Sequence, residues 1–322
     1  MRVRVLGAGI IGLACAEELI RRGHAVDVVD PAPGSGASYA AAGMLSPAGE
    51  LWHGETELFG LGRASLELWP AWAARLGVPL HATGTVLAAA DAGDLQEIDR
   101  QVGLLAAAGL ATEALSRREL LAREPGLGRV VGGAYLPDDH SVDPRRVVAA
   151  LLERVPVGGS GGAAEVTVVA TGARLPAPFT DLVRPVRGEI LRVRVADPAQ
   201  RPAHTVRGLV HGRPVYVVPR AGSDEVVIGA TSEEHDGPPV VTVEGVHVLL
   251  DAARELLPGL DRAEFVEAVA RDRPATADHL PLVGPAGEDG VLLAAGHGRN
   301  GVLLAPLTAQ RIADHVDARE AA

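Results

Sequence analysis

Residues 6–30 read LGAGIIGLACAEELIRRGHAVDVVD, and this stretch decides the fold of the first part of the chain. Residues 2–7 and 25–30, RVRVLG and AVDVVD, are rich in β-branched and apolar side chains, as is typical of buried strands. Between them, residues 10–22 carry apolar side chains at helical spacing and end in Arg-Arg-Gly, a common helix end. The pattern predicts a strand–helix–strand unit.

The turn GAGIIG at residues 7–12 has the glycine spacing of a dinucleotide-binding loop. In such a loop the first glycine makes a tight turn, the second lets the backbone approach a pyrophosphate, and the third lets the helix pack on the strand. The helix N-terminus offers N–H groups and a partial positive charge to phosphates. Asp30, at the end of the second strand, is placed to accept hydrogen bonds from ribose hydroxyls. A turn that serves only helix–strand packing is the alternative.

The composition limits the possible functions. The chain has 322 residues, 47% of them hydrophobic, and a net charge of −11, which argues against nucleic acid or an anionic membrane as the partner. It contains no lysine, which excludes a pyridoxal phosphate Schiff base and any lysine base or nucleophile. The one cysteine, Cys15, fits a small buried side chain in a reducing compartment. Since no leader and no membrane-length apolar run is evident, we expect a cytoplasmic protein, and we expect no metal site.

The rest of the chain divides into two kinds of pattern. Helices are expected at about 54–76, 143–154 and 241–257, and strands at 84–90, 132–139 and 166–172 and over most of 184–270, before a strand, a glycine loop and a helix at 291–316. The small residues of 31–50 are expected to lie against a flat ligand, with a flexible linker as the alternative. The run GGSGG at 158–162 is expected to be a loop or linker.

We therefore expect an α/β fold in which a β-rich domain interrupts a Rossmann-like nucleotide domain of the glutathione-reductase type. The expected nucleotide domain comprises 1–80, 141–183 and 271–322, and the expected substrate domain comprises 81–140 and 184–270.

The chain resembles the D-amino-acid-oxidase family of FAD-dependent oxidoreductases, and within it the glycine oxidases of thiamine biosynthesis. The resemblance runs nearly end to end. Besides the glycine turn and Asp30, it rests on AAAGML at 40–45, VRGEILRV at 186–193, VYVVPR at 215–220, VVIGAT at 226–231, RPATADHLPLVG at 273–284 and AAGHGRNGVLLAP at 294–306.

This resemblance implies an FAD cofactor, held without a covalent bond through sulfur because no C-terminal cysteine is present. With Gly172 at the end of the returning strand, the expected cofactor contacts are Gly7, Gly9, Ile10, Ile11, Gly12, Asp30, Pro31, Ala37, Ser38, Ala42, Gly43, Met44, Gly172, Gly296, His297, Gly298, Arg299, Asn300, Gly301, Val302 and Leu303. A structural role is an equal alternative for His297.

The resemblance also implies the reaction. Hydride leaves the Cα of glycine, sarcosine or a small D-amino acid for flavin N5, the imine hydrolyses, and O2 is reduced to H2O2. Tyr216, Arg273 and Arg299 match the family's substrate contacts, and a guanidinium such as that of Arg273 can bind a carboxylate through two parallel hydrogen bonds. The alternatives are a salt bridge of Arg273 to Asp272 or Asp278, a half-buried strand aromatic for Tyr216 and a surface arginine for Arg299. A homo-oligomer is also implied.

Three features depart from the family pattern. Strands that usually precede 166–172 are missing where GGSGG stands, Arg271-Asp272 replace small or apolar residues, and Gly298 replaces an aromatic. Some relatives use a lysine near the flavin to promote reaction with oxygen, and its absence keeps a D-amino-acid dehydrogenase with another electron acceptor as an alternative. A nicotinamide-dependent dehydrogenase and a flavin-binding protein without turnover are the others.

Overall fold

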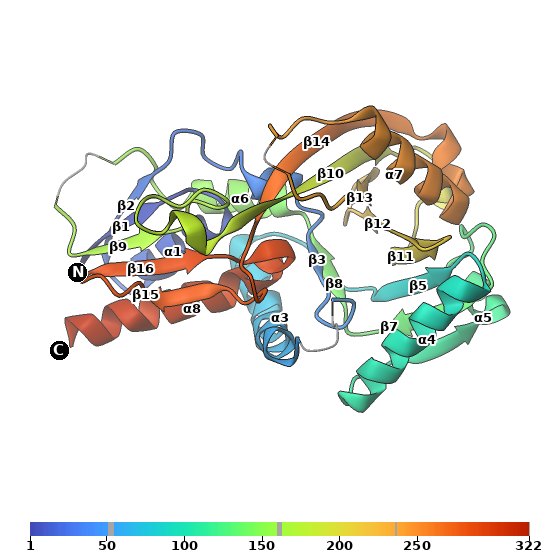
Figure 1. Cartoon of the computed structure of the whole chain (residues 1–322), viewed down its shortest axis with the longest axis horizontal. Coiled ribbons are helices and arrows are strands. Elements are labelled where there is room, and N and C mark those ends of the chain that lie inside the picture. The colour runs from blue at the N-terminus through green and yellow to red at the C-terminus, as the bar shows by residue number, and fades with distance from the viewer. Residues whose placement is uncertain (51–54, 160–162, 236, 322) are drawn as a thin grey trace.

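The computed structural model describes residues 1–50, 55–159, 163–235 and 237–321. Two large β-sheets lie next to each other, and the chain passes between them several times (Figure 1). A small three-stranded sheet consists of β3 (Met44–Leu45), β8 (His140–Val142) and β4 (Leu80–His81) in that order.

The first sheet has five strands in the order β15-β16-β9-β1-β2. Its members are β15 (Leu282–Pro285), β16 (Val291–Ala295), β9 (Val166–Val169), β1 (Arg2–Leu6) and β2 (Ala25–Val29). All neighbouring pairs are parallel except β15 and β16. The parallel strands therefore end at one common edge of the sheet.

Two helices lie against one face of this sheet, α1 (Ile10–Arg21) and α8 (Gly301–Glu320). Two more pack on these helices in turn: α3 (Thr56–Leu76) lies against α8, and α6 (Pro144–Leu152) lies against α1. Their buried side chains form one apolar cluster with those of β1 and β9, including the paired rings of Trp69 and Trp72. The opposite face is covered by Leu175, Phe179 and Val183.

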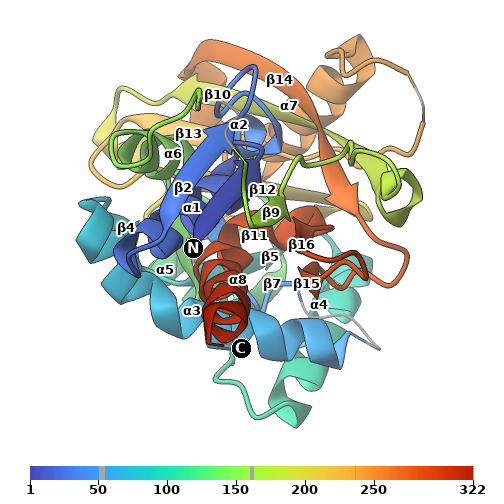
Figure 2. The same ribbon diagram turned by 90° about the vertical axis from the view of Figure 1, so that its left-hand side faces the viewer.

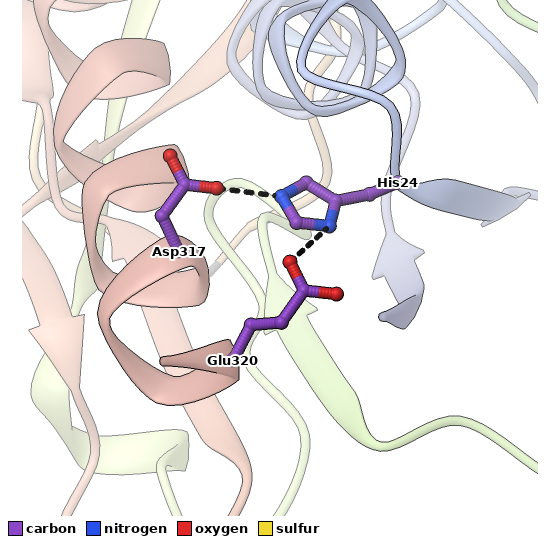
Figure 3. Close-up of side chains that lie close together, drawn as sticks. All are labelled: His24, Asp317 and Glu320. Atoms are coloured by element: carbon purple, nitrogen blue, oxygen red, sulfur yellow. Dashed lines mark hydrogen bonds and ion pairs between the residues drawn. The ribbon is translucent and has the colours of Figure 1, made fainter. Parts of the chain in front are cut away.

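The two ends of the chain lie at the same end of the molecule, where α8 points toward the viewer in Figure 2. His24, at the turn between α1 and β2, holds the last turns of α8: its Nε2 lies 2.8 Å from an oxygen of Asp317 and its Nδ1 lies 3.9 Å from one of Glu320 (Figure 3). The Met1 amine donates to Glu320 at 2.7 Å. These contacts fix α8, whose other end reaches the candidate site.

The second sheet has eight strands in the order β14-β10-β13-β12-β11-β5-β7-β6. They are β14 (Glu264–Ala275), β10 (Arg184–Arg194), β13 (Glu225–Gly229), β12 (Arg213–Pro219), β11 (Thr205–Val210), β5 (Thr85–Ala89), β7 (Gly132–Leu136) and β6 (Glu113–Ser116). The helices α4 (Ala92–Ala107), α5 (Arg117–Arg123) and α7 (Val243–Leu256) lie along it (Figure 1). Short helical segments complete the described chain: α2 (Ala37–Ala40), η1 (Thr180–Leu182), η2 (Pro198–Gln200), η3 (Pro258–Arg262) and η4 (Gly298–Asn300).

The expected α/β fold with mixed sheets is confirmed, and the expected long helices and strands are present with ends shifted by a few residues. The expected domain boundary at 271 falls inside β14, which pairs with β10 along its length except for one irregularity opposite Arg192 and Val193. The division of the chain into two domains stays a prediction. In the GGSGG run, Gly158 donates to the carbonyl of Val28 at 3.0 Å, whereas residues 160–162 lie outside the described residues. Among the described helices, none combines the length and apolar character needed to cross a bilayer.

Candidate active site

The predicted cofactor residues gather at the edge where the parallel strands end. The glycine turn follows β1, Asp30 and Pro31 follow β2, Gly172 follows β9, and the turn beginning at Gly296 follows β16. Because crevices at the carboxyl ends of parallel strands are the usual nucleotide sites of such sheets, this convergence supports the sequence-based assignment.

The glycines of the turn differ in whether the fold itself requires them. Gly7 has a φ of 103°, and a Cβ on Gly12 would lie 2.0 Å from the Gly7 carbonyl oxygen, so the fold requires both glycines. A Cβ on Gly9 would meet only the hydroxyl of Ser38, at 3.3 Å. The fold therefore leaves space at Gly9 at the N-terminus of α1, as a bound pyrophosphate would need.

Asp30 and Ser38 bind the backbone of this turn. The Asp30 carboxylate accepts the N–H of Ala8 at 2.6 Å and that of Ala32 at 2.7 Å. Ser38, on α2, accepts the Ile10 N–H at 3.0 Å. The first-turn amide of α1 is thereby tied to the segment that follows β2, and Ile11 follows it in the helix.

The segment from Ala37 to Met44 is held by a buried arginine. Arg220, which follows β12 and is 5% exposed, donates from Nη1 to the carbonyls of Ala42 and Val142 at 2.5 and 2.9 Å. Burial lowers the pKa of Arg220 to about 10, so it stays charged at neutral pH. Through this contact the segment containing Gly43 is fixed next to the eight-stranded sheet.

The turn before α8 brings the last group of predicted residues to the same place. Gly296 and Gly298 have φ values of 72° and 53°, and α8 begins at Gly301 without a side-chain cap, next to buried Asn300. A Cβ on Gly298 would meet no atom within 4 Å. Val302 lies within α8, and the carbonyl of the next residue, Leu303, accepts hydrogen bonds from α3.

His297 lies in this turn but faces the protein interior. Its Nε2 lies 2.9 Å from the Thr308 hydroxyl, and burial lowers its pKa to about 3. The ring is therefore neutral at ordinary pH and cannot provide positive charge to a cofactor. Its contacts favour the structural alternative.

Tyr216 and Arg273 come together on one face of the eight-stranded sheet. Two glycines of the neighbouring strands make room for them: a Cβ on Gly229 would lie 2.5 Å from the Tyr216 hydroxyl, and one on Gly188 would lie 2.3 Å from Nη2 of Arg273. Burial raises the pKa of Tyr216, while the Arg273 charge and hydrogen bond oppose this rise. The phenol therefore stays a hydrogen-bond donor well above neutral pH.

Arg273 has no carboxylate partner within the part of the chain that the structure describes. Its Nη1 donates to the carbonyls of Arg187 and Thr231, both at 3.2 Å. Asp272 instead accepts a hydrogen bond from Arg187 at 2.6 Å, and Asp278 accepts the N–H of Leu280, so neither forms the salt bridge considered as the alternative. A half-buried guanidinium without a counter-ion beside a phenol donor is suited to bind a carboxylate.

Arg299 points to a different set of groups. Its Nε lies 2.7 Å from a Glu50 oxygen, and its Nη2 donates to Glu55. Glu50 also accepts from Arg207 at 2.7 Å, and the charge of Glu50 contributes to the raised pKa of Tyr216. Arg299 is therefore linked to the Tyr216–Arg273 pair only indirectly, through Glu50, and within the described part of the chain it forms no hydrogen bond or ion pair with either residue of the pair.

Several residues that shape the site were not predicted from the sequence. Gly188, Gly229 and Arg220 lie inside stretches that carried the resemblance, so their positions were a usable signal. Glu50 is the last residue of the small-residue segment 31–50, whereas Arg207 lies on β11 in no recognised motif. Only the pairing of β11 with β12, which sets Arg207 opposite Tyr216, reveals it.

Gly188 provides a test of the Arg273 position. In the Gly188→Ala variant the new methyl group displaces the flexible tip of Arg273 and touches no backbone atom within its three nearest contacts, so the fold survives. We expect KM for the amino acid to rise about 10-fold, the size of one weakened charge-assisted hydrogen bond, with little change in melting temperature. Steady-state kinetics and thermal unfolding measure the two quantities, and an unchanged KM would contradict the proposed position of the guanidinium.

The site as a whole fits FAD. Space at Gly9 and Gly298 leaves the N-termini of α1 and α8 open, Asp30 lies beside the glycine turn, and the backbone of Ala42 to Met44 faces the sheet that bears Tyr216. These features fit the class of enzymes that depend on a dinucleotide cofactor.

Comparisons with known proteins agree with this class. The sequence profile of a family described as "FAD dependent oxidoreductase" (DAO) matches residues 2–159 and 153–315. Glycine oxidase of Geobacillus kaustophilus is 33% identical, with 99% of this chain and 94% of that protein covered. Glycine oxidase of Bacillus licheniformis is 31% identical, with 97% and 92% covered. The crystal structure of the Geobacillus kaustophilus glycine oxidase superposes with a TM-score of 0.88, at 33% identity, over 98% of this chain and 95% of that one.

The chain therefore belongs to the DAO family of FAD-dependent oxidoreductases. It is an FAD-dependent oxidoreductase of amino acids, and the expected FAD cofactor is confirmed.

Proposed function

We propose that the protein oxidises glycine, and with it sarcosine and small D-amino acids, to the imine, which hydrolyses, with O2 as electron acceptor and H2O2 as product. The observation that carries the proposal is the guanidinium of Arg273, which lies beside Tyr216 and forms no ion pair with any described residue. The glycine oxidase relatives support glycine as the substrate. We further propose that the protein is cytoplasmic, that it assembles as a homo-oligomer, and that FAD is bound non-covalently.

In this proposal Arg273 pairs with the substrate carboxylate through two parallel hydrogen bonds, and the Tyr216 hydroxyl donates a third. These contacts hold Cα in one orientation, which is where most of the rate gain of such a site arises. The amine must be neutral to react, and it loses its proton to solvent before the reaction. Among the described residues near the pair, none is needed as a general base.

Bound FAD would supply the two-electron acceptor, taking hydride from Cα and delivering electrons to O2. The glycine turn, Asp30 and the N-terminus of α1 would hold its ADP half, and the segment from Ala42 to Met44 would line the ring. The N-terminus of α8 would stabilise negative charge on the ring through its unpaired N–H groups and helix dipole.

The direct experiment is anaerobic mixing of the flavin-loaded protein with glycine, sarcosine and a series of D-amino acids. We expect the 450 nm absorbance to bleach with glycine and with small substrates, and peroxide to form in air. Bleaching without peroxide would show a dehydrogenase with another acceptor, which the lack of lysine keeps as a second candidate. A flavin that no amino acid bleaches would refute both.

Tyr216 provides a second test. The Tyr216→Phe variant loses one hydrogen bond to a charged group, so we expect KM for glycine to rise about 10-fold while kcat changes little. Tyr135→Phe is the matched control, because Tyr135 lies on another strand of the same sheet, β7, and its hydroxyl donates to the Thr83 carbonyl. If KM is unchanged in Tyr216→Phe, the phenol is only a packed strand aromatic.

A further inference from the structure

Glu50 is shared by two guanidinium groups at the border of the substrate site. One oxygen accepts from Arg207 and the other pairs with Arg299, each at 2.7 Å. The Glu50 charge acts on the nearby Tyr216, whose pKa it helps to raise. A negative charge so close to a carboxylate-binding pair opposes substrate binding unless it is neutralised, and the two arginines neutralise it.

One buried serine holds the segment that carries Glu50. Ser46, 1% exposed, donates its hydroxyl proton to Asp139 and accepts the Gly49 N–H at 3.2 Å. Gly49 also packs closely against Ser46 and Arg207, since a Cβ at Gly49 would lie 2.4 Å from Ser46 Oγ and 2.8 Å from Nη1 of Arg207. Ser46 therefore links Asp139 to the backbone of Gly49, the residue before Glu50.

Asp139, 2% exposed, lies between β7 and β8. The groups that face it come from three elements: the Ser46 hydroxyl from the segment after β3, the Thr85 hydroxyl from β5, and the Arg207 charge from β11. The Glu50 charge also reaches it. Asp139 thus accepts a hydrogen bond from Ser46, which holds the segment carrying Glu50, and it interacts electrostatically with Arg207, which is paired with Glu50.

We propose that Asp139 is a positioning residue for substrate binding: through Ser46 it holds the segment 46–50 so that the Glu50 carboxylate stays between Arg207 and Arg299 and away from the Tyr216–Arg273 pair. The proposal rests on the proposed function only in taking that pair as the carboxylate site. Asp139 itself does not touch the substrate. Losing it would free the Glu50 charge to oppose an anionic ligand.

The test uses the flavin-loaded protein and acetate, a carboxylate that cannot be oxidised, with binding followed by the perturbed flavin spectrum. We expect Ser46→Ala and Asp139→Ala to weaken acetate binding about 5- to 10-fold, the effect of one lost hydrogen bond, with flavin content unchanged. Asp139→Asn keeps an acceptor for Ser46, so binding at pH 6 should stay close to that of the unmodified protein. The readout does not require turnover, so it remains valid if glycine is not the substrate.

Glu124→Gln is the matched control. Glu124 is also 2% exposed, and its carboxylate accepts from the N–H groups of Ala203 and His204, far along the chain from the segment 46–50. Asp139→Ala and Glu124→Gln should both lower the melting temperature, but only Asp139→Ala and Ser46→Ala should weaken acetate binding. If Asp139→Ala and Ser46→Ala bind acetate as tightly as Glu124→Gln does, Asp139 is merely structural and the proposal is wrong.

A pH profile provides a second readout. Burial raises the pKa of Asp139 to about 7, against the hydrogen bonds of Ser46 and Thr85, which lower it. As pH rises through about 7, a second negative charge forms beside Glu50, so acetate affinity of the unmodified protein should fall over this range. Asp139→Asn has no charge to gain and should remove this step. A step that persists in Asp139→Asn would overturn the assignment.

Discussion

Replacing Arg273 by methionine should lower kcat/KM for glycine by about 10²- to 10³-fold, since removing one member of a desolvated charge pair costs about 3–4 kcal/mol. Methionine fills similar space over Gly188 but donates no hydrogen bond, and Tyr216 alone cannot balance the substrate charge. The carbonyls of Arg187 and Thr231 also lose a donor, but that of Arg187 keeps the N–H of Glu233 at 3.0 Å. Steady-state kinetics over a wide glycine range measure the effect.

Arg271→Met is the matched control for this variant. Arg271 is two residues earlier on β14, but its Nε donates to the Ser35 carbonyl at 2.8 Å and its guanidinium lies near the Tyr39 ring, away from Tyr216. We expect its kcat/KM to stay within about threefold of the unmodified protein, the usual scale of a surface contact. Equal losses in both variants would show that positive charge on the strand, and no specific carboxylate contact, supports activity.

The features that could be predicted from the sequence are those carried by adjacent residues. The glycine turn and Asp30 lie within one strand–helix–strand unit, so local spacing places them correctly. Strand β6 was missed because its residues, Glu113 to Ser116, are mostly exposed and show no apolar alternation. It is the outer strand of its sheet, where little apolar side-chain burial is required.

The electrostatic environment of the site could not be predicted in the same way. Arg299 pairs with Glu50, which is 249 residues away along the chain. Its glycine-rich loop favoured a ligand contact and left a surface position as the alternative, and neither interpretation includes this ion pair. Tyr216 meets Arg273 only because β12, β13, β10 and β14 pair in that order with the observed register. The role of Asp139 could not be predicted, because the sequence does not distinguish a buried aspartate from an exposed one in a loop. Only its partners in the fold show the difference.

The glycine turn yields the second large effect, because its second and third glycines, Gly9 and Gly12, are needed for different reasons. In Gly9→Ala the new methyl group meets only the Ser38 hydroxyl at 3.3 Å, so the apoprotein should fold with an almost unchanged melting temperature. The same methyl group would keep a pyrophosphate from the amides of α1. We expect FAD to bind about 10²-fold more weakly, as the loss of two charge-assisted hydrogen bonds implies.

In Gly12→Ala we expect the opposite: the main loss is in the stability of the apoprotein and not in contacts to FAD. Its methyl group would lie 2.0 Å from the Gly7 carbonyl oxygen, a backbone atom that cannot move without displacing β1 or α1. The apoprotein should therefore lose about 3 kcal/mol of unfolding free energy, the upper range of overpacking in a core. Thermal unfolding of the apoproteins and flavin titration of both variants separate the two effects. If Gly9→Ala destabilises the apoprotein as much as Gly12→Ala does, the whole turn serves helix–strand packing, and the space at Gly9 is no argument for a pyrophosphate.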